Sequence, residues 1–253
     1  MTDESFERWL RALEARHLAD LRVPEVTRAL RALSSAYVER RHNMARGAAL
    51  DSHGKRAAFA LFYAPLHFLV TRHVVRALGA GAATPSSVFD IGCGTGAAGA
   101  AWALQAGRVP VTGVDRHPWA VEEARWTYKQ LGLRGQARSG DVTARLPPMR
   151  SGSGVIVAYV LNELPASVRA RVEQALLSAA GRGVAVLVLE PIARPLTPWW
   201  EATARDFEAA GGRADEWRFA VALPPMLRLF DKAAGLNHGE LTARSLFCAG
   251  RRT

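Results

Sequence analysis

The stretch VFDIGCGTGAAGAAWAL, residues 88–104, is the feature that most constrains the fold of this 253-residue chain. A short apolar run leads into glycines at positions 92, 94, 96 and 99, and an alanine-rich run follows. Glycines at this spacing allow a tight turn and let the backbone approach a ligand closely. The stretch therefore predicts a buried strand, a ligand-binding loop and the first turn of a helix.

After this loop, strand patterns alternate with helical patterns, which predicts a mostly parallel sheet covered by helices on both faces. Between the last two expected strands there is room for at most a short helix. One strand of this C-terminal part is expected to close the sheet in the antiparallel direction. The expected strands after the first lie at 109–115, 136–142, 154–161, 184–190, 216–223 and 241–250.

Residues 1–80 have a different character, because their apolar side chains recur at helical spacing. The longest apolar helix is expected over 55–78, with a kink at Pro65. The composition of residues 79–87, GAGAATPSS, predicts a linker. We therefore expect a helical N-terminal extension over residues 1–80 and an α/β domain over 81–253.

Two classes of cofactor use a glycine loop of this kind, and in both we expect backbone amides of the loop to face the ligand. Gly94, Gly96 and Gly99 match the GxGxxG fingerprint of dinucleotide sites. Asp90, two residues before a GxGxG pattern, is instead typical of sites for S-adenosylmethionine (SAM), whose ammonium group suits a carboxylate. Asp115, at the end of the second strand, can bind ribose hydroxyls in either class and does not discriminate.

Asp141 separates the two classes. It follows the third strand, where its carboxylate can accept from the adenine amino group while the Val142 amide donates to a ring nitrogen. Acids at the ends of three successive strands (Asp90, Asp115 and Asp141) predict SAM rather than a dinucleotide. Gly99, which completes the rival fingerprint, is then expected to serve helix packing.

With these motifs, residues 86–250 resemble the class I SAM-dependent methyltransferases. The resemblance implies an enzyme with a Rossmann-like α/β fold and a seven-stranded sheet whose last strand is antiparallel. It implies SAM as the cofactor. The two isolated cysteines predict no metal site, and Cys93 is expected to be a small filler in the loop. The expected cofactor-binding residues are Asp90, Gly92, Cys93, Gly94, Gly96, Asp115, Arg116, Asp141, Val142 and Tyr159.

The residues after the fourth strand, YVLNELP at 159–165, are expected beside the transferred methyl group. Asn162 and Glu163 are the candidate catalytic residues there; the alternative is that they form the N-terminal cap of a helix after Pro165. The stretch lacks the Asn/Asp-Pro-Pro-Tyr motif of exocyclic-amine methylation. It also lacks the cysteine that covalent cytosine methylation requires.

The stretches VIVAYVLNELP and LVLEPIARP resemble a narrower family, the ribosomal-small-subunit methyltransferase-like proteins of bacteria and mitochondria. Glu190 and Pro191 match that family, whereas Ile192 to Arg194 replace its Gly-Thr. The family's cysteine-rich C-terminal segment is missing, so an iron–sulfur cluster is not implied for this chain.

The formal net charge is +10, and residues 1–80 hold 13 Lys and Arg against 8 Asp and Glu. A basic balance favours a polyanionic partner, so we expect RNA or the ribosomal small subunit. Genome composition is the alternative, because only three of the 33 basic residues are lysines. The best basic cluster is the loop RHNMARG, with Arg40, Arg41 and Arg46. Arg40 and Arg41 are candidate substrate-binding residues, and the alternative is a solvated loop.

The stretch DSHGKRAAFALFY at 51–63 is similar to a segment of the 16S rRNA methyltransferases that confer aminoglycoside resistance. Arg56 and Tyr63 of this segment are candidates for closing over SAM or the substrate. A small-molecule methyltransferase with the helical extension as its lid remains an alternative to RNA methylation. A SAM-binding ribosome-assembly factor without catalysis is another.

The chain has two cysteines, Cys93 and Cys248, and neither lies in a CxxC pair. A disulfide framework is therefore not expected, and a reducing cytoplasm fits. The longest apolar run, 58–70, is too short for the roughly 20 residues of a membrane span. We expect a cytoplasmic monomer that does not enter a membrane.

Overall fold

The computed structural model describes residues 2–39, 50–81, 85–142, 146, 148–236 and 238–250. Its contacts divide the chain into two compact units. One unit combines Met1–Leu66 with Ala220–Leu241, and the other combines His67–Phe219 with Thr242–Thr253. The first unit is therefore discontinuous in sequence, because a late segment joins the N-terminal residues.

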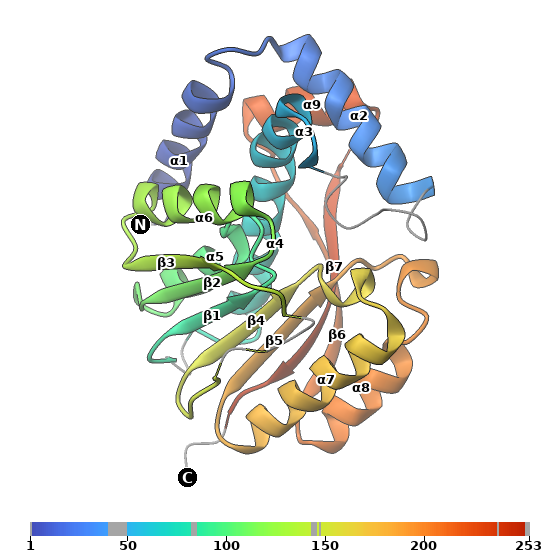
Figure 1. Cartoon of the computed structure of the whole chain (residues 1–253). Coiled ribbons are helices and arrows are strands. Elements are labelled where there is room, and N and C mark those ends of the chain that lie inside the picture. Colours follow the sequence, from blue (N-terminus) through green and yellow to red (C-terminus); the bar gives the residue numbers. More distant parts are fainter. Residues whose placement is uncertain are drawn as a thin grey trace. The chain divides into compact units, whose positions relative to one another are not determined.

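The sheet unit contains seven strands in the order β3-β2-β1-β4-β5-β7-β6 (Figure 1). Strands β1 to β5 pair in parallel, and β7 runs antiparallel to β5. This is the seven-stranded, Rossmann-like sheet that the sequence predicts. The strands are β1 Val88–Ile91, β2 Val111–Asp115, β3 Gly135–Ser139, β4 Gly154–Ala158, β5 Ala185–Glu190, β6 Arg213–Ala220 and β7 Glu240–Cys248.

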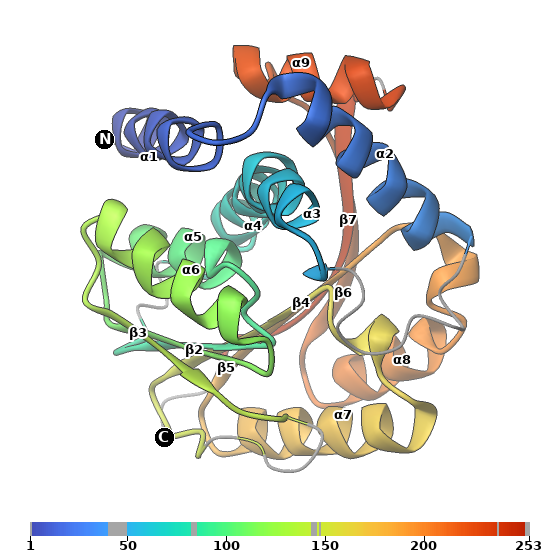
Figure 2. The same ribbon diagram turned by 45° about the horizontal axis from the view of Figure 1, so that its top comes forward.

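Helices cover both faces of this sheet, with α5 and α6 on one face and α7 and α8 on the other (Figures 1 and 2). Double coverage explains why β5 is buried along its whole length and reads as a continuous apolar run before Glu190. The helices are α5 Ala97–Gln105, α6 Pro118–Gln130, α7 Ala166–Gly181 and α8 Trp200–Ala209.

The other unit is helical. Its late segment forms a ten-residue helix, α9, which buries Leu227 and Phe230 and contacts both α2 and a π-helical turn. The sequence predicted at most a short helix here, and did not predict that it joins the N-terminal residues. The elements are α1 Thr2–His17, α2 Val23–Glu39, α3 His53–Ala58, the π-helical turn Phe59–Tyr63 and α9 Pro225–Ala234.

The apolar helix expected over 55–78 is present, as α3, the π-helical turn and α4 (Ala64–Ala77) in continuous succession. The irregularity lies one turn before Pro65, where the Ala64 N–H donates to the Phe59 carbonyl in the π pattern. Proline has no N–H to continue a regular ladder, so the turn ahead of it adjusts. By length and composition alone this helix could cross a membrane, but 72% of its most apolar window is buried in the structure, as in the core helix of a globular protein.

Candidate functional site

The carboxyl ends of β1, β2 and β3 lie side by side, because these strands are parallel neighbours in the sheet. Asp90 lies within β1, Asp115 is the last residue of β2, and Asp141 follows β3 by two residues. The structure therefore places the three predicted acids along one edge. The strand order reverses between β1 and β4, which is where ligands bind in open α/β sheets.

The backbone of the glycine loop favours glycine at two positions, Gly92 and Gly96. Gly92 has φ +67°, and a Cβ on it would lie 2.5 Å from Cγ2 of Val160, just after β4. Gly96 has φ +79°, and a Cβ there would lie 2.7 Å from the Tyr128 ring. Side chains at these positions would meet both backbone strain and a direct clash.

Tyr128, on α6, is the residue beneath the loop that sequence reasoning missed. It is fully buried, and its ring also occupies the space that a Cβ on Gly113 or Gly135 would need. The Cys93 sulfur flanks the same face of Gly113, and burial raises the pKa of its thiol well above the usual value. Cys93 is thus a buried filler, as predicted. The available signal for Tyr128 was a large aromatic residue in α6 combined with glycines in the two adjacent strands.

The sequence predicts that amides of the loop face the ligand, and this stays a prediction. Five amides between Gly92 and Gly99 donate to acceptors within the protein. The five are Gly92 and Cys93 to the Val114 carbonyl, Gly94 to Asp115 Oδ2, Gly96 to the Cys93 carbonyl and Gly99 to Asp90 Oδ2.

Asp90 is only 1% exposed, and its Oδ2 accepts the Gly99 N–H at 2.8 Å. Burial raises the pKa of Asp90 to about 7; the Gly99 hydrogen bond opposes this shift, and the nearby Asp115 adds to it. A Cβ on Gly99 would lie 2.6 Å from Asp90 Oδ2, so Gly99 makes room for the carboxylate as well as for helix packing. A buried carboxyl group of this kind fits a ligand that brings an ammonium group, as SAM does.

Both oxygens of Asp115 already accept backbone N–H groups, Oδ2 from Gly94 at 2.9 Å and Oδ1 from His117 at 2.8 Å. A carboxylate has about four acceptor positions, so two ribose hydroxyls can still bind. Arg116 and Asp141 are exposed next to this edge, and Val142 is half-buried against the core. Their contacts with SAM stay predictions.

The turn after β4 is fixed by the buried Glu190 at the end of β5. Glu190 Oε1 accepts the Leu161 N–H at 2.8 Å and the Asn162 N–H at 3.3 Å. Asn162 Oδ1 is buried and has no hydrogen-bond partner among the described residues. The N-cap residue of α7 is Pro165, so the helix-capping interpretation of Asn162 is wrong. The sequence analysis named Glu190 only through the family resemblance. The available signal was an acidic residue at the end of an otherwise apolar strand.

Tyr159 lies directly after β4 with φ +60°, which is rare for a residue other than glycine. Its ring stacks on His67 of α4, with ring centroids 4.2 Å apart and an interplanar angle of 20°. Burial raises the pKa of Tyr159 and lowers the pKa of His67 to about 4, so both rings are neutral near pH 7. Glu163 is exposed in the short 3₁₀ turn that follows, Leu161–Glu163.

The residues predicted to form a lid belong to the helical unit. Arg56 Nε donates to the Leu50 carbonyl at 2.8 Å, and the Tyr63 hydroxyl is 3.0 Å from the Ser34 hydroxyl. Both side chains thus help to hold that unit together, and their role over SAM stays a prediction. Arg40 and Arg41 lie outside the described residues.

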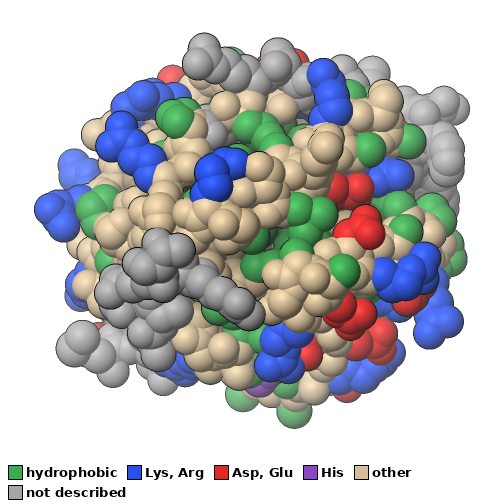
Figure 3. Space-filling view, turned by 90° about the horizontal axis from the view of Figure 1, so that it is seen from below, with side chains coloured by type: hydrophobic (Ala, Val, Ile, Leu, Met, Phe, Trp, Pro, Cys, Tyr) green, Lys and Arg blue, Asp and Glu red, His purple; other side chains and the backbone are tan. Residues whose placement is uncertain are grey.

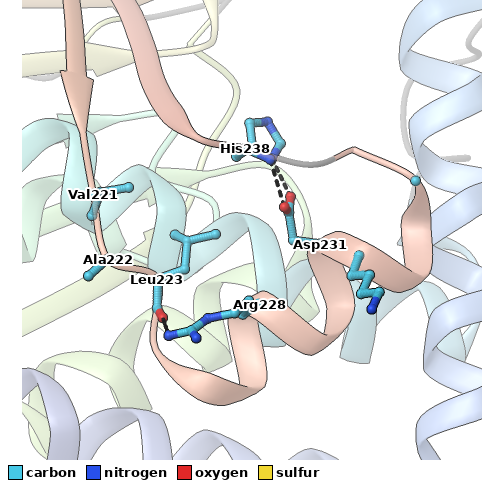
Figure 4. A pocket seen from close by; sticks show the side chains of 8 residues that line it. Val221, Ala222, Leu223, Arg228, Asp231 and His238 are labelled. Carbon is cyan, nitrogen blue, oxygen red and sulfur yellow. Dashed lines mark hydrogen bonds and ion pairs between the residues drawn. The ribbon is translucent and has the colours of Figure 1, made fainter.

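The helical unit also contains a pocket of about 790 Å³ beside α9 (Figure 4). The buried Asp231 accepts hydrogen bonds there from both the backbone N–H and the ring of His238. Arg228 donates to the Leu223 carbonyl at 2.9 Å, and Lys232 completes the polar side of the lining. The partner of His238 lies seven residues earlier in the chain.

Comparisons with known proteins agree with this geometry. Residues 88–181 match the family described as "Methyltransferase domain". No curated protein sequence matches the chain. The solved methyltransferase domain of bacterial CtHen1-C is 16% identical, with a TM-score of 0.52, covering 74% of this chain and 100% of that one.

Two further solved structures are similar to this chain. One is a putative O-methyltransferase from Nostoc punctiforme, 16% identical with a TM-score of 0.50, covering 92% of this chain and 71% of that one. The other is an O-methyltransferase family protein from Burkholderia thailandensis, 19% identical with a TM-score of 0.51, covering 81% and 61%. At such identities the likeness shows the fold alone. The family match over residues 88–181 and the acids at the carboxyl ends of the strands identify a SAM-dependent methyltransferase.

Proposed function

We propose that this SAM-dependent methyltransferase acts on RNA, and within RNA on small-subunit ribosomal RNA. The net charge of +10 carries the proposal, because neutralising phosphates and releasing their counterions is the main source of affinity for RNA. The resemblance of VIVAYVLNELP and LVLEPIARP to ribosomal-small-subunit methyltransferase-like proteins supports the same acceptor.

The surface charge is mixed on the face shown in Figure 3. Lys and Arg side chains stand there in separate groups, and on one side Asp and Glu side chains stand between them. Because charges of both signs occur on this face, net charge alone does not show how many phosphates the protein neutralises. The salt dependence of RNA binding measures that number directly. A protein that neutralises several phosphates loses affinity with a log–log slope of about −0.7 per phosphate for single strands. We expect a slope steeper than about −2 for a small-subunit rRNA fragment, measured by filter binding between 50 and 300 mM KCl. A slope near zero would contradict the RNA proposal.

Labelling identifies the acceptor directly. The purified protein is incubated with tritiated SAM and with separated RNA, protein and metabolite fractions of a bacterial lysate. We expect tritium in the RNA fraction, concentrated in the small-subunit rRNA. Label in the metabolite fraction alone would instead support a small-molecule acceptor. SAM binding without label in any fraction would support an assembly factor.

The matched control for labelling is Asp115→Ala compared with Asp115→Asn. The alanine variant loses both carboxylate oxygens at the ribose position and should weaken SAM binding by about 1–3 kcal/mol, measured by calorimetry. The asparagine variant keeps one acceptor oxygen and should lose less affinity. Equal affinity for the wild type and both variants would contradict the placement of SAM at this sheet edge.

A further inference from the structure

His67 and Tyr159 come from distant parts of the sequence and meet as a ring stack in the sheet unit. Both side chains are half-buried, so each keeps some accessible surface, while β4 beneath them is buried from Gly154 to Val157. Tyr159 holds an unfavourable positive φ that positions its ring at the end of the strand. Non-glycine residues keep such strain mostly at functional sites, where the surrounding structure holds it in place.

The position of this stack relative to the glycine loop is fixed by direct contact. Val160, the residue after Tyr159, packs into the space that a side chain on Gly92 would occupy. Strands β1 and β4 are parallel neighbours, so the loop after β1 and the turn after β4 emerge at the same edge. The stack therefore follows β4, next to the glycine loop where we expect the cofactor, on the side away from Asp115 and Asp141.

We propose that His67 is the proton acceptor of methyl transfer, and that the acceptor substrate offers a hydroxyl or an amide-like N–H group to it. This inference rests on the methyltransferase reaction itself and holds for an RNA, protein or small-molecule acceptor. It assigns the catalytic role to His67 rather than to Asn162 or Glu163. Tyr159 then acts as a positioning residue that fixes the plane of the imidazole ring.

The chemistry balances with this single base. Bound SAM supplies a methyl group on a positively charged sulfur. A lone pair on the acceptor's nitrogen or oxygen forms the new bond to the methyl carbon, and the C–S bond breaks with its electron pair left on sulfur. The proton of the acceptor's N–H or O–H passes to a ring nitrogen of His67. One positive charge is present before the step and one after it, so no counter-ion has to enter the site.

The state of the imidazole suits this role. Desolvation keeps the pKa of His67 low, and the neutral ring is the form that accepts a proton. A methylated oxygen or amide-like nitrogen that still holds its proton is far more acidic than an imidazolium ion. Proton transfer to His67 is therefore downhill even though burial weakens the base.

His73 provides a matched control on the same helix. It stacks on Phe219, with ring centroids 3.7 Å apart, and so is also a half-buried histidine against an aromatic ring. With His67→Gln we expect methyl incorporation to slow by about 100- to 10,000-fold, while calorimetry shows SAM affinity within about threefold of wild type. With His73→Gln we expect the wild-type rate. A His67→Gln variant that binds SAM and methylates at the wild-type rate would overturn the proposal.

A second measurement needs neither an acceptor nor a variant that folds. SAM and S-adenosylhomocysteine differ only in the methyl group and its charge, so a base beside that methyl senses the difference. In the full-length, ¹⁵N-histidine-labelled protein we expect the ring signals of His67 to differ between the two complexes and those of His73 to coincide. Coinciding His67 signals, or failure of SAM to bind, would overturn the inference. If the His67 signals differ but the tritium experiment labels no fraction, methyl transfer to the tested acceptors is contradicted. The placement of His67 beside the methyl group is then still supported.

The position of the methyl group in the product is a third test of the proposal. Where labelling succeeds, mass spectrometry of the product locates the methyl group. We expect it on an atom that carried a proton, such as a hydroxyl oxygen or an amide-like nitrogen. A methyl group on a ring nitrogen that had only a lone pair, giving a cationic base, would need no proton acceptor and would overturn the role of His67.

Discussion

At the residue scale, individual neighbours explain the glycines of the cofactor loop. Gly92 is opposed by Val160, Gly96 by Tyr128 and Gly99 by Asp90. Each contact joins the loop to a different element, so a side chain at any of the three would push apart two parts of the site. Packing against neighbouring elements, as well as ligand binding, therefore explains why these positions are glycines.

Gly96→Ala tests this packing. The variant has to hold φ near +79° and place a methyl group 2.7 Å from the Tyr128 ring. Gly107→Ala is the matched control, because Gly107 has φ +87° with no atom within 4 Å of the added Cβ. Backbone strain alone costs about 1–2 kcal/mol of unfolding free energy, so we expect that loss for Gly107→Ala and a larger loss for Gly96→Ala. Equal losses in urea denaturation would mean that the Tyr128 contact does not matter.

Asp90 predicts how stability varies with pH. Its pKa is about 7 in the folded protein, against 3.8 for the model carboxyl. Between these values the folded state keeps a proton that the unfolded state has lost, so unfolding free energy falls as pH rises. The stabilising contribution is complete below about pH 4 and is lost as pH passes through about 7. Without SAM, the slope between pH 5 and 7 should approach but not exceed about 1.4 kcal/mol per unit.

Asp90→Asn is the control for this pH dependence. The amide oxygen can still accept the Gly99 N–H, but the group no longer titrates. We expect the slope between pH 5 and 7 to flatten in this variant, measured by thermal or urea denaturation. A slope that persists unchanged would assign the pH dependence to another group.

At the element scale, the turn after β4 depends on the strand beside it. The buried Glu190 carboxylate at the end of β5 holds two amide groups of that turn, and Tyr159 takes its strained conformation just before them. The parallel pairing of β4 with β5 brings these residues together although they are about thirty positions apart. The geometry of the turn after β4 thus depends on β5, although no residue of β5 is predicted to contact the cofactor.

Glu190→Ala should therefore damage the site more than Glu190→Gln. The alanine variant leaves the Leu161 and Asn162 amides without their acceptor, at about 1–3 kcal/mol for each buried group. The glutamine variant keeps the Oε1 acceptor and should lose less unfolding free energy. We expect hydrogen exchange at Leu161 and Asn162 to speed up in the alanine variant and to stay slow in the glutamine variant. Slow exchange in both would show that other contacts hold the turn.

At the scale of the whole molecule, the helical unit combines the N-terminal residues with a late internal segment, Ala220–Leu241. Helix α9, placed between β6 and β7 in sequence, buries Leu227 and Phe230 within a unit otherwise made of N-terminal residues. The sequence boundary expected near residue 80 followed composition and could not include a late segment. Contacts, rather than sequence order, define this unit.

Deleting residues 1–50 tests the discontinuous unit. The deletion removes α1 and α2, so the α9 face that contacts α2 becomes exposed. Exposing a buried Leu or Phe side chain costs about 1.5–3 kcal/mol, so we expect binding of a hydrophobic dye and self-association in size-exclusion chromatography. The control carries the same deletion and also has a short Gly/Ser linker in place of residues 222–238, which removes α9. This variant should bind less dye. A deletion variant that stays monomeric and binds no dye would contradict the assignment of α9 to the helical unit.

Much of the sheet unit could be predicted from sequence because its signals are local. Continuous apolar runs predicted β1, β4 and β5, and acids at strand ends predicted a cofactor site there, since parallel strands place their carboxyl ends together. The contacts of Tyr128, Glu190 and His67 could not be predicted in the same way. Each acts through a partner on another element, and no periodicity in the chain encodes such a contact.

The sequence by itself determined the fold class and the methyl donor, because a glycine loop with three strand-end acids carries its chemistry in the spacing of residues. Only the tertiary structure decided the orientation of the loop amides, the burial of Asp90 and the stacking of His67 on Tyr159. Those properties depend on which atoms are brought within a few ångströms of each other when the sheet and its helices pack. Packing of this kind joins residues far apart in the chain.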